Sequence, residues 1–153
     1  MNQKNNARRI CAGLFLVYGL IMIYLLFLQR TPSWDRYWDV VSQSYNLQPM
    51  KTVSQMMGLL HSRPALARFA IINLIGNVVM FIPLGLLPAI WQRQRKFGWY
   101  ALTVSIVILL IELLQLFTTL GSADVDDFLF NLLGALIGFG IWRTVCSICR
   151  LNQ

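Results

Sequence analysis

Residues 99–120 read WYALTVSIVILLIELLQLFTTL, and Glu112 is the one acidic or basic side chain in this stretch. A helix needs about 20 apolar residues to cross the roughly 30 Å of hydrocarbon in a bilayer. Three further apolar stretches of similar length occupy residues 10–28, 69–91 and 128–148. The sequence therefore predicts an all-α membrane protein with four transmembrane helices.

The composition also favours a membrane domain. Charged residues make up 12% of the 153 residues, whereas soluble domains carry about a quarter. Four spans leave little sequence for a separate soluble core, so we expect one domain over residues 1–153. Basic residues precede the first span, as in a signal peptide, but its apolar stretch exceeds the usual ~7–15 residues. We therefore expect an uncleaved anchor.

Basic side chains are unevenly distributed around the spans. One group precedes the first span, a second fills the loop between the second and third, and a third follows the fourth: Lys4, Arg8 and Arg9; Arg93, Arg95 and Lys96; Arg143 and Arg150. Four crossings place these groups on one side, which the positive-inside rule makes cytoplasmic. We expect both termini in the cytoplasm. The net charge of +7 then reflects orientation and contact with membrane lipids, and no nucleic-acid partner is expected.

The segment between the first two spans predicts a long outer loop. Loop 1, residues 29–68, carries basic residues on the outside, and long loops cross the membrane largely regardless of charge. Aromatic side chains typical of the lipid headgroup region occur in it: Trp34, Tyr37, Trp38 and Tyr45. We expect loop 1 to lie on the outer surface, with an interfacial helix over residues 52–60.

Polar side chains gather in the outer half of the predicted membrane region. A charged side chain at mid-bilayer costs about 2.5–3.5 kcal/mol on insertion scales, so such residues are candidates for function. Glu112 is expected about 12 Å below the outer boundary, at a rise of about 1.5 Å per residue. The whole set predicts one water-accessible pocket among the last three spans: Asn73, Asn77, Glu112, Gln115, Asp124, Asp126, Asp127 and Asn131.

These residues also have structural interpretations. Asp126 or Asp127 would be a suitable cap for the fourth helix, because a carboxylate at a helix start accepts hydrogen bonds from free N–H groups. The asparagines would join helices by hydrogen bonds, and Glu112 would be a hydrogen-bonded structural group. Gly134 and Gly138 form a GxxxG spacing, which lets another helix approach closely.

Three ordered segments of the chain resemble the VanZ-like membrane proteins of bacteria. They read NLIGNVVMFIPLG at residues 73–85, ELLQ at residues 112–115 and DVDDFLFNLLG at residues 124–134. An earlier segment, NLQPMKT at residues 46–52, is similar to one that precedes them in the family. The resemblance covers about residues 46–142.

The resemblance implies a polytopic helical protein of the bacterial plasma membrane, linked to the cell envelope and to low-level resistance to the glycopeptide teicoplanin. By position, the family's polar set corresponds to Asn73, Asn77, Glu112, Gln115, Asp124, Asp127, Asn131 and Gly134. Family members often carry an arginine shortly before the aspartates, whereas residues 121–123 are Gly-Ser-Ala here. This difference argues against anion binding by that loop.

The first functional hypothesis is binding of a membrane lipid. The pocket would hold an envelope lipid or a lipid-linked cell-wall precursor and so contribute to teicoplanin-type resistance. Lys51, Arg63 and Arg68 of loop 1 would meet a phosphate or pyrophosphate as charged hydrogen-bond donors.

The second hypothesis is an intramembrane hydrolase or transferase acting on such a lipid. Glu112 would be the general acid or base. Asp124, Asp126 and Asp127 would hold a divalent cation such as Mg²⁺, the one cofactor considered, through oxygen ligands. No known catalytic signature is present, so the sequence leans away from an enzyme.

The third hypothesis is a structural protein that forms a homo-oligomer through Gly134 and Gly138. A transporter is less favoured, because the polar residues stop halfway across the membrane and leave no path to the cytoplasm.

Overall fold

The computed structural model describes residues 2–29, 31–91 and 97–151. Helices make up almost all of it: α1 (Asn2–Ile23), the π-helical turn η1 (Tyr24–Leu28), the 3₁₀ turn η2 (Trp34–Arg36), α2 (Tyr37–Gln43), α3 (Lys51–Ser62), α4 (Pro64–Trp91), α5 (Phe97–Phe117) and α6 (Val125–Leu151). Two short strands, β1 (Tyr45–Asn46) and β2 (Ala123–Asp124), interrupt the helices. The basic residues 93, 95 and 96, used above to orient the chain, lie outside the described residues.

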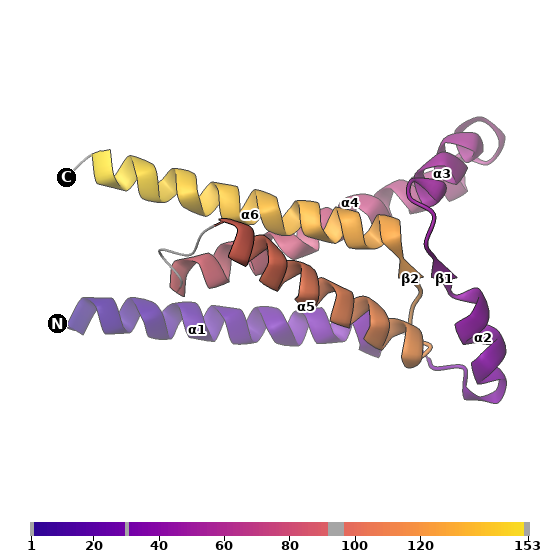
Figure 1. Cartoon of the computed structure of the whole chain (residues 1–153), viewed down its shortest axis with the longest axis horizontal. Helices are drawn as coiled ribbons and strands as arrows, with labels where there is room; N and C mark the ends of the chain where they lie inside the picture. The colour runs from indigo at the N-terminus through magenta and orange to yellow at the C-terminus, as the bar shows by residue number, and fades with distance from the viewer. Residues whose placement is uncertain (1, 30, 92–96, 152–153) are drawn as a thin grey trace.

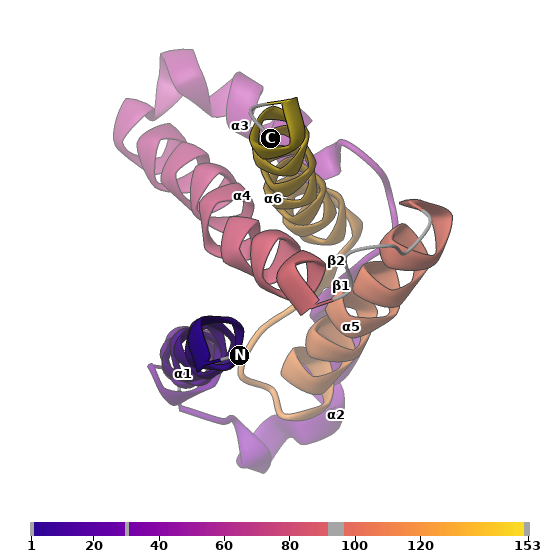
Figure 2. The ribbon, with the colours of Figure 1, turned by 90° about the vertical axis from the view of Figure 1, so that its left-hand side faces the viewer.

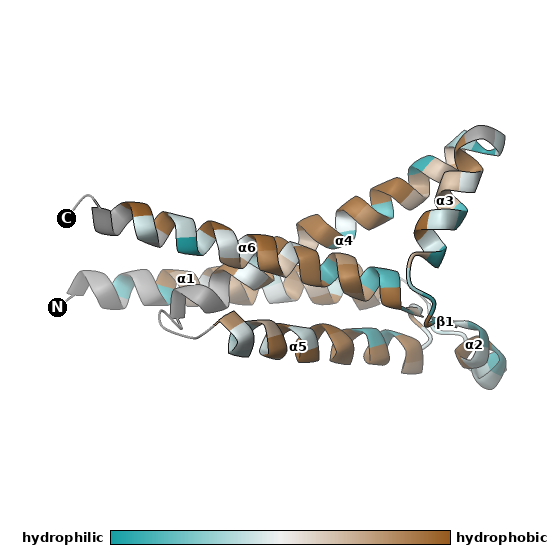
Figure 3. Cartoon of the chain, turned by 45° about the horizontal axis from the view of Figure 1, so that its top comes forward, coloured by the Kyte–Doolittle hydropathy of each residue, from teal (hydrophilic) through white to brown (hydrophobic). Residues whose placement is uncertain are grey.

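Four of the helices are long and apolar enough to cross a membrane: Arg9–Leu28, Pro64–Leu86, Phe97–Phe117 and Val125–Val145. This confirms the prediction of an all-α membrane protein with four spans. Figure 1 shows both ends of the chain at one end of the bundle, the terminal end, and α2, α3, β1 and β2 at the other, the loop end. In Figure 3 the hydrophobic colour predominates along α4, α5 and α6, and hydrophilic residues recur at the loop end.

The second span begins earlier than its apolar stretch. Helix α4 starts at Pro64, directly after α3, because proline lacks an N–H group and its fixed φ suits the first turn of a helix. The carbonyl of Arg63 accepts the first helical hydrogen bond from the N–H of Ala67 (3.1 Å). The helix expected at residues 52–60 is present as α3.

The third span ends earlier than expected, at Phe117 rather than residue 120. Thr119 adopts a left-handed conformation (φ 55°), which turns the chain out of the helix. The N–H groups of Leu120 and Gly121 then both donate to the carbonyl of Gln115, at 3.1 Å each. Apolarity continues past the end of the helix, so hydropathy alone placed the boundary too late.

Helices α4 and α6 touch through their backbones. A Cβ atom built on Gly134 would lie 2.1 Å from the carbonyl oxygen of Val78, and one on Gly138 would lie 2.1 Å from that of Ile82. On the facing helix, a Cβ on Gly85 would lie 1.9 Å from the carbonyl oxygen of Ala135. The GxxxG face of α6 is therefore occupied by α4 of the same chain, and a homo-oligomer would need another surface.

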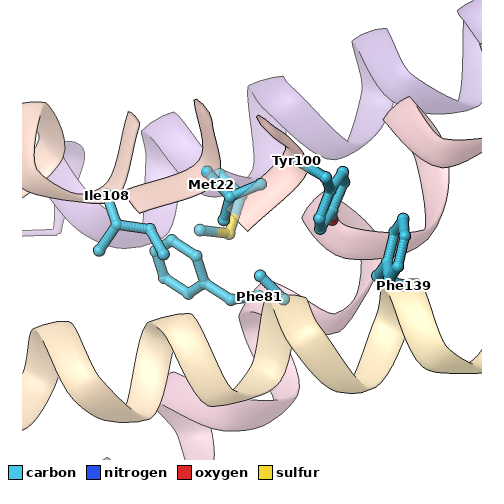
Figure 4. Packing of buried hydrophobic residues seen from close by; sticks show 7 residues of the cluster. Met22, Phe81, Tyr100, Ile108 and Phe139 are labelled. Atoms are coloured by element: carbon cyan, nitrogen blue, oxygen red, sulfur yellow. The ribbon is translucent and has the colours of Figure 1, made fainter. Parts of the chain in front are cut away.

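The apolar core lies where the four spans meet. Figure 4 shows Met22 of α1, Phe81 of α4 and Ile108 of α5 converging beside the stacked rings of Tyr100 and Phe139. The two ring centroids are 4.1 Å apart. The core thus joins the helices through side chains where they are not in backbone contact.

Helix α1 is the least enclosed span. Only 6% of its most apolar stretch is buried against the rest of the chain, compared with 22–28% in the other three spans. Figure 2 shows α1 at the edge of the bundle. The Tyr18 hydroxyl donates to the carbonyl of Met80 (2.8 Å), which ties α1 to α4.

Loop 1 is fastened to the start of α6. Strands β1 and β2 pair in parallel, with Asn46 beside Asp124. The carboxylate of Asp126 is fully buried and accepts the backbone N–H groups of Met50 (2.5 Å) and Thr52 (2.9 Å) at the start of α3. We call this contact the Asp126 clamp. Met50 itself has a left-handed backbone (φ 63°), which the clamp helps to hold.

The glycine contact predicts a position-specific effect of added methyl groups. Gly138→Ala should push α4 away from α6 and lower stability by about 1–3 kcal/mol, the usual cost of overpacking. Gly140→Ala is the matched control, because nothing lies within 4 Å of a Cβ at Gly140. Thermal unfolding of both purified variants checks this, and equal melting temperatures would contradict it.

The Asp126 clamp predicts a local effect on α3. In Asp126→Asn an NH₂ group would face a backbone N–H, leaving buried donors unpaired at a cost of about 1–3 kcal/mol. Amide hydrogen exchange at Met50 and Thr52 should therefore rise about tenfold or more. Asp39→Asn, an exposed acid on α2, should leave both amides unchanged. Unchanged exchange in Asp126→Asn would show that the clamp does not hold α3.

Candidate functional site

A cavity of about 530 Å³ lies toward the loop end of the bundle, with walls from the end of the first span, α4, α5 and α6. Its lining includes six of the eight polar residues singled out in the sequence: Asn73, Asn77, Glu112, Gln115, Asp127 and Asn131. Asp124 and Asp126 are not among the residues that line it. The polar set therefore divides into six residues that line this cavity and a neighbouring loop-end cluster, Asp124 and Asp126.

Glu112 and Asn131 form the buried wall of the cavity. They are 5% and 4% exposed, and the Asn131 side-chain amide donates to Glu112 Oε1 (3.0 Å). Glu112 Oε2 and Asn131 Oδ1 have no hydrogen-bond partner among the described residues. Because an unpaired buried polar atom costs about 1–3 kcal/mol, these two acceptors are candidates for contact with a bound molecule.

Two further contacts hold the cavity together. The amide of Asn77, on α4, donates to Asp127 Oδ1 on α6 (2.6 Å). The amide of Gln115, on α5, donates to the carbonyl of Leu26 in η1 (3.3 Å). Carbonyls in the last turn of a helix lack a donor within the helix, so Gln115 satisfies one and fastens the first span to α5. Asn73 lies on α4 with an exposed side chain.

The loop-end cluster contains the other two acids, and it corrects the capping interpretation. The helix cap is Asp124, which immediately precedes α6 and accepts the N–H of Asp126 (2.8 Å). Asp124 also accepts hydrogen bonds from Asn46 (3.1 Å) and Thr52 (2.7 Å). Asp126 instead binds the start of α3 through the clamp. Both carboxylates therefore position loop 1.

The acids do not gather as metal ligands. Among the described residues, no group of three or more His, Cys, Asp or Glu side chains is placed to hold a metal ion. Both oxygens of Asp126 face backbone N–H groups, and Asp127 pairs with Asn77 across the bundle. The three-aspartate arrangement considered from the sequence is not formed.

The described lining of the cavity is rich in hydrogen-bond acceptors. It contains two carboxylates, Glu112 and Asp127, and no lysine, arginine or histidine. Chemically, such a lining suits a partner that donates hydrogen bonds, such as a hydroxyl or an ammonium group. A second, apolar pocket of about 380 Å³ also borders Glu112, and half of its lining residues belong to α5, among them Ile106, Leu109 and Leu113.

Some site residues were not identified from the sequence. Gln29 and Ser122 line the cavity from loop segments, and no spacing pattern distinguishes them. Asn46 and Thr52 bind Asp124, and their signal was present in NLQPMKT, the segment similar to the family. The wall formed by Leu25 and Leu26 depends on how the first helix packs, which hydropathy does not encode.

Comparison with known proteins identifies the family. The VanZ/LLP1 family matches residues 15–148, which include most of the first span, the other three spans and both polar groups. The match begins within α1, well before the expected start near residue 46. No curated protein and no solved structure matches the chain. Because the match covers most of the sequence, the chain belongs to the VanZ/LLP1 family.

Proposed function

We propose that the cavity binds an envelope lipid or a lipid-linked cell-wall precursor, and that this binding contributes to resistance against glycopeptides of the teicoplanin type. The observation that carries the proposal is Glu112 Oε2, a buried acceptor with no partner among the described residues, in the wall of a cavity of about 530 Å³. Polar groups within a membrane span are costly, and they commonly mark a binding site.

The proposed orientation places the loop end outside a bacterial plasma membrane. Arg9 belongs to the first half of α1 and Arg143 to the last third of α6, both with exposed side chains, and positive residues favour the cytoplasmic side. The cavity then lies in the outer half of the membrane.

Exposed cations at the loop end support binding of a phosphate-containing molecule. Lys51 begins α3, Arg63 joins α3 to α4, and Arg68 lies in the second turn of α4, and all three side chains are exposed. A phosphate held there would leave the rest of the molecule free to reach the cavity. Charged hydrogen bonds of this kind are about twice as strong as neutral ones.

The proposal predicts loss of resistance in Glu112→Gln. Glutamine has nearly the same size, but it cannot carry a negative charge, and it places an NH₂ group where a carboxyl oxygen stood. In a glycopeptide-susceptible host that expresses the chain, the increase in minimum inhibitory concentration of teicoplanin given by the wild type should be largely lost. Membrane abundance, measured by immunoblot, should stay within about twofold.

Asp35→Asn is the matched control, because Asp35 is an exposed acid in loop 1 that does not line the cavity. It should retain the full increase in inhibitory concentration. An unchanged phenotype in Glu112→Gln at equal abundance would refute the proposed role of the cavity.

A further inference from the structure

The cavity opens sideways toward lipid. Besides its polar residues, it is lined by Phe69 and Ile72 of α4, which are 73% and 66% exposed. Both belong to the candidate membrane span Pro64–Leu86, so their exposed surfaces would face lipid in the proposed orientation. The opposite wall is η1, at the end of the least enclosed span. A molecule can therefore reach Glu112 from within the membrane.

The charge of the cavity selects the group that enters. A buried carboxylate is stable only where hydrogen bonds or a positive charge compensate it. Glu112 accepts a hydrogen bond from Asn131 at Oε1, its Oε2 is unpaired, and the described lining offers no cation. Asp127 adds a second carboxylate to the same cavity. A primary ammonium group would supply both the charge and the N–H donors that the unpaired oxygens require.

On these grounds we infer that the cavity takes the ethanolamine headgroup of an outer-leaflet phospholipid, which enters between η1 and α4 with its ammonium group toward Glu112. This inference rests on the proposed lipid-binding function and specifies its ligand. The volume of about 530 Å³ lies within the range of about 300–1,000 Å³ that holds small molecules. A cavity of this volume suits a single phospholipid headgroup, whereas a group as large as a glycopeptide would not fit.

Arg68 is placed to meet the phosphate of the same headgroup. It precedes Ile72 by four residues, so both side chains lie on one side of α4. Arg68 is nearer the loop end, and its side chain is exposed. The zwitterion of the headgroup thus matches a cation one helical turn from Ile72 and the carboxyl groups of Glu112 and Asp127 in the cavity.

The test is the headgroup selectivity of the purified full chain. Native mass spectrometry from detergent micelles would measure dissociation constants for phosphatidylethanolamine, phosphatidylcholine and phosphatidylglycerol with identical acyl chains. Phosphatidylcholine keeps the positive charge but has no N–H donor, and phosphatidylglycerol has hydroxyl donors but no cation. Phosphatidylethanolamine should bind about tenfold or more tightly than either, the effect expected for one hydrogen bond to a charged group. Equal binding of the three lipids would overturn the inference.

Two variants locate the binding. Glu112→Gln should reduce affinity for phosphatidylethanolamine to that for phosphatidylcholine. Ile72→Trp should block the mouth and weaken binding about tenfold, without disturbing the buried core because Ile72 is largely exposed. Ile75→Trp is the matched control: Ile75 is 57% exposed on the same helix but does not line the cavity, and it should bind as the wild type does. Wild-type binding by Ile72→Trp would overturn the lateral route.

Failure of this inference is distinguishable from failure of the proposed function. A resistance phenotype that depends on Glu112, combined with no selectivity for ethanolamine, would refute the inference and leave the proposed function standing. Selective, Glu112-dependent binding of phosphatidylethanolamine with no change in glycopeptide susceptibility would support the inference and refute the proposed role in resistance.

Discussion

The backbone contact between α4 and α6 is the constraint on which the other contacts depend. Lipid tails are as apolar as leucine, so helices in a bilayer associate through close packing and hydrogen bonds. Here Gly85, Gly134 and Gly138 let the two backbones touch. That contact fixes the register of the helices, and in this register Asn77 reaches Asp127 at 2.6 Å. One wall of the cavity therefore depends on three glycines, whose lack of a side chain lets α4 and α6 approach.

The acids of the chain have two different roles despite their proximity in sequence. Asp124 and Asp126 accept hydrogen bonds from the ends of helices and from loop 1, and Asp126 is fully paired. Glu112 is bound by Asn131 but keeps one unpaired oxygen. In a low-dielectric environment a carboxylate with all its hydrogen bonds made stabilises the fold. A carboxylate with an unpaired oxygen destabilises it unless another molecule binds there. Pairing, rather than charge or depth, separates the positioning acids from the candidate binding acid.

The sequence predicted the four spans and the family, because apolar length and ordered motifs are local properties. It could not predict exact helix ends, since Pro64 begins α4 within a polar stretch and Thr119 turns the chain out of α5 within an apolar one. It also treated eight polar residues as one pocket. Only six line the cavity. Asp126 instead binds the start of α3, which lies more than 70 residues away in the chain. Contacts of that separation depend on tertiary structure.

That separation has a consequence for biosynthesis. Asn46 meets Asp124 across 78 residues, so loop 1 leaves the ribosome long before its partner strand is made. At a synthesis rate of about 5–20 residues per second, the wait is about 4–16 s. During this interval the first two spans can insert while loop 1 has no partner strand, and its edge is open to other chains or to quality-control proteases. The last span therefore completes the loop end as well as the bundle.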